Sequence, residues 1–147
     1  MKENQVDQIY EAVRKINHAY EVWALHHGLT LYEMQVYYIM MSKEQQRITQ
    51  KDLCKKLDAP KTSMNSIIKK QVQRGYIELN VNSDNRREKI VTLTNKGKEF
   101  AETLILPLYR YEQDAFDTLD KQAVQTTITI QNQFADQLLK KVGEHDE

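Results

Sequence analysis

The fold is decided by the stretch GYIELNVNSDNRREKIVTLTNKG, which covers residues 75–97. Two short segments of strand-forming residues, 77–81 and 90–93, enclose a polar tip that contains Arg86 and Arg87. The first segment alternates apolar and polar residues, as a half-buried strand does. Patterns typical of helices lie on both sides. We therefore expect a short β-hairpin, with arginines at its tip, between two helices.

The residues before the hairpin predict two helices joined by a turn. Thr49 is placed to cap a short helix over 50–57, and Asp58-Ala59-Pro60 forms the turn. Pro60 suits the first position of a second helix, over about 60–74, which Gly75 ends. The apolar positions that should face the core are Leu53, Cys54, Leu57, Met64, Ile67 and Ile68, with Val72 as a further candidate. Helix, turn, helix and hairpin together predict a winged helix-turn-helix.

The two ends of the chain show helical periodicity. A first helix over 4–26 should end at Gly28 in a left-handed cap, and Thr30 with Glu33 should form a capping box for a helix over 31–41. Ile48 is an isolated apolar residue that can pair with the hairpin. Thr94 should cap a helix from residue 95, kinked by Pro107. The last periodic segment is 118–141; residues 126–130 alternate like a strand, but both flanks keep the helical period, so we assign helix. The fold class is mainly α.

Charge is distributed unevenly along the 147 residues. The formal net charge is zero, yet residues 42–100 contain 14 Lys and Arg against 7 Asp and Glu, and the remaining residues contain 7 against 14. The basic excess coincides with the hairpin and the two helices before it, where it would favour phosphates. No apolar run is long enough to span a bilayer, no signal peptide is evident, and a single Cys fits a reducing cytoplasm.

Enzyme classes find little support in the sequence. It contains no glycine-rich phosphate loop and no pattern of Cys, His or carboxylate typical of catalysis, so we expect neither an enzyme nor a cofactor. His18, His26 and His27 have no second ligand cluster at metal spacing, and no metal site is predicted. Cys54 occupies an apolar helix position and is better explained as a small core residue than as a redox switch.

Polar and basic residues on the second helix of the motif, on the helix before it and on the hairpin predict a DNA-binding surface. In such a motif the second helix enters the major groove, phosphate contacts fix position and base contacts give specificity. The candidate DNA-binding residues are Gln50, Lys51, Lys61, Thr62, Ser63, Asn65, Ser66, Lys69, Asp84, Arg86, Arg87 and Lys89.

The sequence resembles the MarR family of bacterial regulators. The resemblance rests on Gly28-Leu29-Thr30, on the segment from Thr49 to Ile77, and on the tip Asp84-Asn85-Arg86-Arg87 followed by Leu93-Thr94-Asn95-Lys96-Gly97, and it is clear over 28–100. It implies one MarR-like domain over 1–147, with a winged helix-turn-helix lobe over 30–100 and a helical dimerisation lobe formed by 1–29 and 101–147.

The resemblance also implies roles for single residues. Arg86 would enter the minor groove, held by Asp84, and a narrow, negative groove suits a guanidinium. One position departs from the family, since the residue four before Gly75 is usually leucine and is Gln71 here. Either Val72 supplies the missing core contact or Gln71 bonds to a buried partner.

A homodimer is implied by the family and supported independently by the apolar stripes at both ends of the chain, which one winged helix does not need. The predicted function is a sequence-specific, DNA-binding transcriptional regulator, in particular a ligand-responsive repressor of a pseudo-palindromic operator. The alternative is a winged-helix adaptor that binds another protein. A small aromatic or amphipathic effector could bind among the aromatic residues Trp23, Tyr37, Tyr38, Tyr109 and Tyr111.

Overall fold

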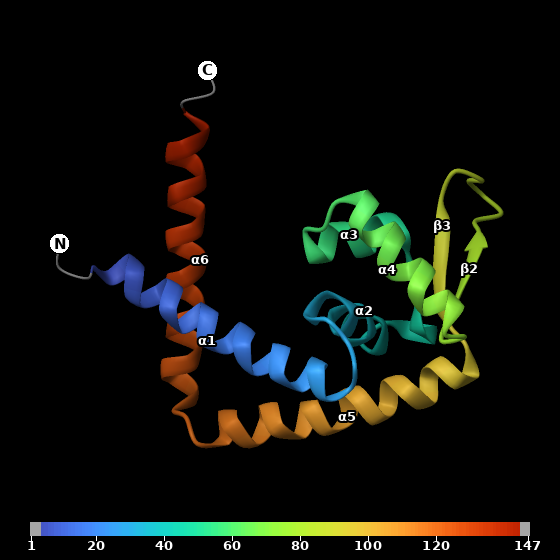
Figure 1. The fold of residues 1–147 in the computed structure, drawn as a ribbon. Coiled ribbons are helices and arrows are strands. Elements are labelled where there is room, and N and C mark those ends of the chain that lie inside the picture. The colour runs from blue at the N-terminus through green and yellow to red at the C-terminus, as the bar shows by residue number, and fades with distance from the viewer. Residues whose placement is uncertain (1–3, 145–147) are drawn as a thin grey trace. The chain divides into compact units, whose positions relative to one another are not determined.

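The structure, a computed structural model, describes residues 4–144 and divides into two compact units, Met1–Leu106 and Pro107–Glu147 (Figure 1). Helix α5 (Asn95–Asp117) runs through the boundary between them, and Pro107 lies inside it. The other elements, in chain order, are α1 (Gln5–His26), α2 (Leu31–Met41), the 3-10 turn η1 (Glu44–Gln46), β1 (Arg47–Thr49), α3 (Gln50–Leu57), α4 (Lys61–Gln73), β2 (Ile77–Val81), β3 (Lys89–Leu93) and α6 (Lys121–Gly143).

The helices begin where the sequence provides capping side chains. Thr30 accepts a hydrogen bond from the Glu33 backbone N–H, and Thr49 accepts one from Asp52, as predicted. Gly28 and Gly75 adopt positive φ angles of 69° and 81° after α1 and α4, which residues with a Cβ rarely adopt.

Two details of capping were predicted wrongly. The Glu33 side chain does not return to Thr30 to complete a capping box but accepts hydrogen bonds from α4. Pro60 is the N-cap of α4, one residue before the helix begins, where it lacks a capping side chain. The turn before it is closed by Asp58 in the left-handed conformation.

A three-stranded antiparallel sheet forms the base of the hairpin, in the order β1-β3-β2. Ile48 lies opposite Val91, and the predicted pairing of this isolated residue with the hairpin is confirmed. The prediction of a half-buried first strand was wrong beyond its start, because only Ile77 of β2 is buried and Leu79 and Val81 are exposed. The strand lies at the sheet edge, and the distal half of the hairpin projects from the helices (Figure 1).

The core of the first unit lies where α2, α3, α4, the sheet and the start of α5 meet. Its fully buried side chains include Met34, Met40, Leu53, Met64, Ile68, Val91, Leu104 and Ile105. Trp23 ties α1 to the start of α5, since its indole N–H donates to the Leu104 carbonyl over 2.8 Å. Cys54 and Ile67, predicted as core residues, are only half-buried, and Val72 is 39% exposed.

A buried polar cluster replaces apolar packing between α2 and α4. We call it the Glu33 cluster: Glu33, Tyr37, Lys70, Gln71 and Arg74. The Glu33 carboxylate, only 3% exposed as a residue, accepts hydrogen bonds from Lys70 (3.2 Å), Gln71 (2.9 Å) and Arg74 (3.3 Å). The Tyr37 hydroxyl donates to Gln71 Oε1 over 2.6 Å. Of the two explanations for Gln71, bonding to a buried partner is therefore confirmed.

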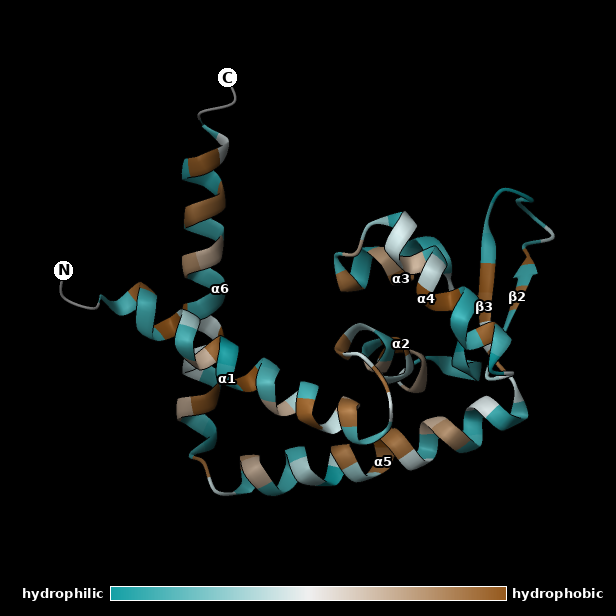
Figure 2. Ribbon diagram, viewed as in Figure 1, coloured by the Kyte–Doolittle hydropathy of each residue, from teal (hydrophilic) through white to brown (hydrophobic). Residues whose placement is uncertain are grey.

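The second unit consists of the end of α5 and the whole of α6. Asp120 caps α6 through the Ala123 N–H, and residues 126–130 are helical, as predicted. No residue of α6 is buried, although the helix carries apolar side chains along its length (Figure 2). The kink at Pro107 stays a prediction. No helix in residues 4–144 combines the length and the hydropathy needed to cross a membrane.

Candidate nucleic-acid interface

Helix α4 presents a polar and basic surface to solvent. Its apolar residues Met64 and Ile68 pack inward, which leaves the opposite side of the helix free. All six candidate residues on α4 are exposed: Lys61, Thr62, Ser63, Asn65, Ser66 and Lys69. The Ser66 hydroxyl donates to the Thr62 carbonyl over 3.3 Å, so its oxygen remains available as an acceptor.

A cleft of about 540 Å³ brings α3, α4 and the hairpin together. We call it the recognition cleft. Its cations are Lys51 from α3, Lys61 from α4, and Arg87 and Lys89 from the hairpin, and Glu88 is its single carboxylate. It also contains Gln50, Cys54 and Asn65. Six of the twelve DNA-binding candidates therefore line one concave, positively charged surface.

Gln50 differs from the other candidates because it is only 8% exposed. Its side-chain amide donates to Asn65 Oδ1, which joins the start of α3 to the exposed face of α4. The predicted contact of Gln50 with the DNA backbone stays a prediction. The bond uses the Asn65 oxygen, so the NH2 group of this exposed residue keeps its capacity to donate.

The hairpin tip has an ordered backbone. Asn82 Oδ1 accepts from the Asp84 N–H over 3.1 Å, and Asn85 Oδ1 accepts from the Arg87 N–H over 3.2 Å. Asparagine side chains that bond two residues ahead favour such turns. Arg86 and Arg87 are exposed. Within residues 4–144 no ion pair joins Asp84 to Arg86, so the implied holding contact is absent from this structure.

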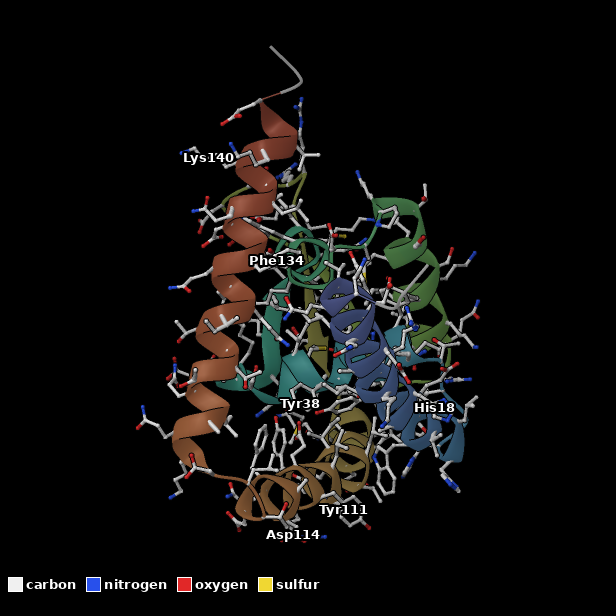
Figure 3. The ribbon with its side chains drawn as sticks, turned by 90° about the vertical axis from the view of Figure 1, so that its left-hand side faces the viewer. His18, Tyr38, Tyr111, Asp114, Phe134 and Lys140 are labelled. Carbon is white, nitrogen blue, oxygen red and sulfur yellow. The ribbon has the colours of Figure 1, made fainter. Side chains whose placement is uncertain are left out.

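The five aromatic residues proposed for an effector site have different surroundings. Tyr37 is wholly buried, with its ring 5.2 Å from that of Phe100, and its hydroxyl is bonded to Gln71. Burial raises the pKa of Tyr37 well above its usual range, so the phenol stays a donor. Tyr37 is therefore a core residue. Tyr38 and Tyr111 lie on α2 and α5 (Figure 3), and an effector site formed by Trp23, Tyr38, Tyr109 and Tyr111 stays a prediction.

A second hollow of about 740 Å³, which the sequence did not predict, is lined by residues of α3, β1 and the hairpin. Its cations are Lys43, Arg47, Lys55 and Lys56. Their positions in the sequence do not show that the four side chains lie around one hollow. Among residues 4–144, no group of three or more His, Cys, Asp or Glu side chains is placed to hold a metal ion.

Comparisons with known proteins found one family model and several solved structures with a similar fold. The model of the MarR family matches residues 27–88, from the end of α1 to the hairpin tip. A search of curated proteins gave no significant match. Among solved structures, NMB1585, a MarR family regulator from Neisseria meningitidis, has 22% identity and a TM-score of 0.81, with 97% of this chain and 99% of that chain covered.

Two further structures share the fold at lower identity. AbsC, a MarR family transcriptional regulator from Streptomyces coelicolor, has 18% identity and a TM-score of 0.71, with 99% of this chain and 97% of that chain covered. The S. aureus MepR–DNA complex has 14% identity and a TM-score of 0.76, with 93% and 99% covered. The family model thus matches the helix-turn-helix and the hairpin, and the chain shares the winged-helix fold of these MarR family structures along nearly its whole length.

Proposed function

We propose that this chain is a DNA-binding transcriptional regulator that recognises a specific sequence. The observation that carries the proposal is the recognition cleft, in which four cations from three separate elements surround the start of α4. Converging cations beside an exposed polar helix are the expected surface for phosphates and base edges. One protein with the same fold, S. aureus MepR, has been solved as a complex with DNA.

We expect α4, the hairpin tip and the cations of the recognition cleft to contact different parts of the DNA. The exposed face of α4 would enter the major groove, with Asn65 held by Gln50 and with Lys61 and Lys69 at its edges. Asparagine pairs favourably with adenine in that groove. Arg86, at the exposed tip, would enter the adjacent minor groove, where a narrow groove concentrates negative potential. Lys51, Arg87 and Lys89 would contact the sugar-phosphate strand that runs between the two grooves.

The protein would act as a homodimer. Helix α6 has no buried residue, yet it exposes apolar side chains at intervals of four residues: Ile130, Phe134, Leu138 and Val142. Helix α1 exposes Tyr10, Val13 and Ile16, at intervals of three residues. Helices with unpaired apolar stripes gain stability by burying them, and a second copy of the chain is the partner that is always present. Two-fold pairing predicts a pseudo-palindromic operator with half-sites roughly 34 Å apart.

Regulation would follow from the spacing of the two α4 helices. A bound dimer blocks access to the DNA it covers, so repression is the simplest outcome. A small ligand that prefers a dimer with wrongly spaced helices would release the operator.

The function is tested by selecting bound duplexes from a random pool with the full-length protein. We expect a pseudo-palindrome to emerge and its affinity to fall steeply with salt, because bound phosphates release counterions. Arg86→Ala should cost about 1–3 kcal/mol of binding while the oligomeric state is unchanged. Arg14→Ala, which removes an exposed charge from α1, is the control and should bind as the wild type does. Failure to enrich any duplex at low ionic strength would overturn the proposal and favour a protein-binding adaptor.

A further inference from the structure

The second hollow is a candidate binding site, and Asp84 is the one predicted DNA-binding residue in its lining. We call it the outer groove. It lies between α3, β1 and the hairpin tip, and its volume is about 740 Å³. The hairpin tip forms a wall of both hollows: Asn82 and Asp84 line the outer groove, and Arg87, Glu88 and Lys89 line the recognition cleft.

The outer groove carries a positive charge that its surroundings do not neutralise. Four cations line it, Lys43, Arg47, Lys55 and Lys56, against the carboxylates of Asp52 and Asp84. The formal balance is therefore +2. In the part of the chain that the structure describes, none of these cations forms an ion pair, although two carboxylates share the groove with them. Such cations can pair with an outside anion without first breaking an internal contact.

Helix α3 determines which hollow each of its cations faces. Lys51 lines the recognition cleft, whereas Lys55 and Lys56, four and five residues later, line the outer groove. The last turn of α3 is basic, which suits the negative end of a helix dipole and needs no ligand. Arg47 on β1 and Lys43 before η1 lie outside that helix, so helix-end charge does not account for their presence in the same groove.

From this arrangement we infer that the outer groove binds the second sugar-phosphate strand of the minor groove that the hairpin tip enters. The inference rests on the proposed function. A minor groove is bounded by two strands about 6 Å apart, so a tip inserted into it has one strand on each side. The recognition cleft meets the strand shared with the major groove that α4 enters. The outer groove meets the opposite strand, which leads to the flank of the operator.

Contacts with both strands would give the hairpin a second role. With cations on both sides of the tip, the protein would grip both phosphate walls and sense the distance between them. A narrow minor groove would bring both strands within reach, and a wide one would lose the outer contact. The outer groove would thus add preference for flanking sequence without touching a base.

The test is Lys55→Ser/Lys56→Ser, which leaves the groove without net charge. Both residues are exposed, so the fold should persist. The probe is a duplex selected by the wild-type protein from a random pool and extended by about ten base pairs, one helical turn, on each side. With counterion release of about 0.9 per phosphate contact, we expect the slope of log affinity against log salt to become shallower by roughly two per half-site. Arg14→Ser/Lys15→Ser removes the same charge from α1 and should leave the slope unchanged.

Phosphate ethylation interference locates the contact. The wild-type protein should show interference on both strands beside the tip, and the double variant should lose it on the outer strand alone. An unchanged slope together with unchanged interference on both strands would overturn the inference while DNA binding itself stands. If the wild-type protein enriches no duplex, the proposed function fails first, so the two failures are distinguishable.

Discussion

At the scale of single residues, Gln71 shows how hydrogen bonds can compensate for a polar residue at a position where leucine is expected. The resemblance to the MarR family predicts leucine at this position, and an unbonded amide in its place would be costly in an apolar core. Here both ends of the amide are bonded, since Gln71 accepts from the Tyr37 hydroxyl and donates to Glu33. No buried side-chain N or O atom in residues 4–144 lacks a partner. The departure is thus compensated by residues 34 and 38 positions away in the sequence.

That compensation predicts a strong coupling between Tyr37 and Gln71. Tyr37→Phe leaves the Gln71 oxygen without its donor, and Gln71→Leu leaves the buried hydroxyl alone, so each should cost about 1–3 kcal/mol of the free energy of unfolding. The double variant removes both polar groups at once and keeps the ring against Phe100. Its cost should fall short of the summed single costs by about 0.5–3 kcal/mol.

Chemical denaturation of the four proteins measures this coupling. Glu33 loses its Gln71 donor in both variants that contain the Gln71→Leu substitution, so this loss cancels in the cycle. Purely additive costs would show that the hydroxyl and the amide act independently, contrary to the structure.

At the scale of elements, the sequence predicted where the helices begin and end more accurately than it predicted which side chains are buried. Capping by Thr30 and Thr49 and the glycine ends of α1 and α4 depend on neighbours in the chain, and these predictions are confirmed. The role of Glu33 depends on what folds against it, and it was predicted wrongly. The outer groove was overlooked for the same reason, because it gathers residues 43–56 and 82–90 only after the hairpin has formed.

The junction between the hairpin and α5 depends on one glycine. A Cβ built on Gly97 would lie 1.9 Å from the Tyr76 carbonyl oxygen, a backbone atom that no rotamer change can move. In the same place Thr94 bridges the two elements, accepting from the Gly97 N–H and donating to the Gly75 carbonyl. Gly97 therefore allows α5 to approach the start of β2 closely.

We expect Gly97→Ala to lower the free energy of unfolding by about 1–3 kcal/mol, the cost of inserting a methyl group into a packed site. Gly143→Ala is the matched control, because a Cβ added there would meet nothing within 4 Å and the residue sits in the last turn of α6. The control should be neutral or stabilising by up to about 1 kcal/mol, as alanine favours helix. Equal stabilities in thermal or urea unfolding would show that the junction relaxes freely.

At the scale of the whole molecule, the proposed function requires a dimer of two copies of the chain. Substitutions in α6 test this requirement most directly. Its exposed stripe includes Phe134 and Leu138, four residues apart and therefore on one side of the helix. Figure 3 labels Phe134 on α6. Each side chain is large and apolar. A stable interface buries roughly 800 Å² per partner, and it would bury such a stripe of side chains.

Phe134→Lys/Leu138→Lys should therefore convert the protein to a monomer, since two charges would have to be buried without partners. Gln133→Lys/Gln137→Lys adds the same charge to the same turns at exposed polar positions and should leave the dimer intact. Sedimentation across a range of concentrations measures the mass of each variant. The core of the first unit should stay folded in the monomer, with a cooperative unfolding transition, because its buried apolar side chains all lie between Ala24 and Leu108. On a selected palindrome it should bind no better than on a single half-site, because only linked copies of α4 reach both grooves together. A lysine variant that stays dimeric would place the subunit contact elsewhere, and a monomer that retained full affinity would remove two-fold recognition from the proposed function.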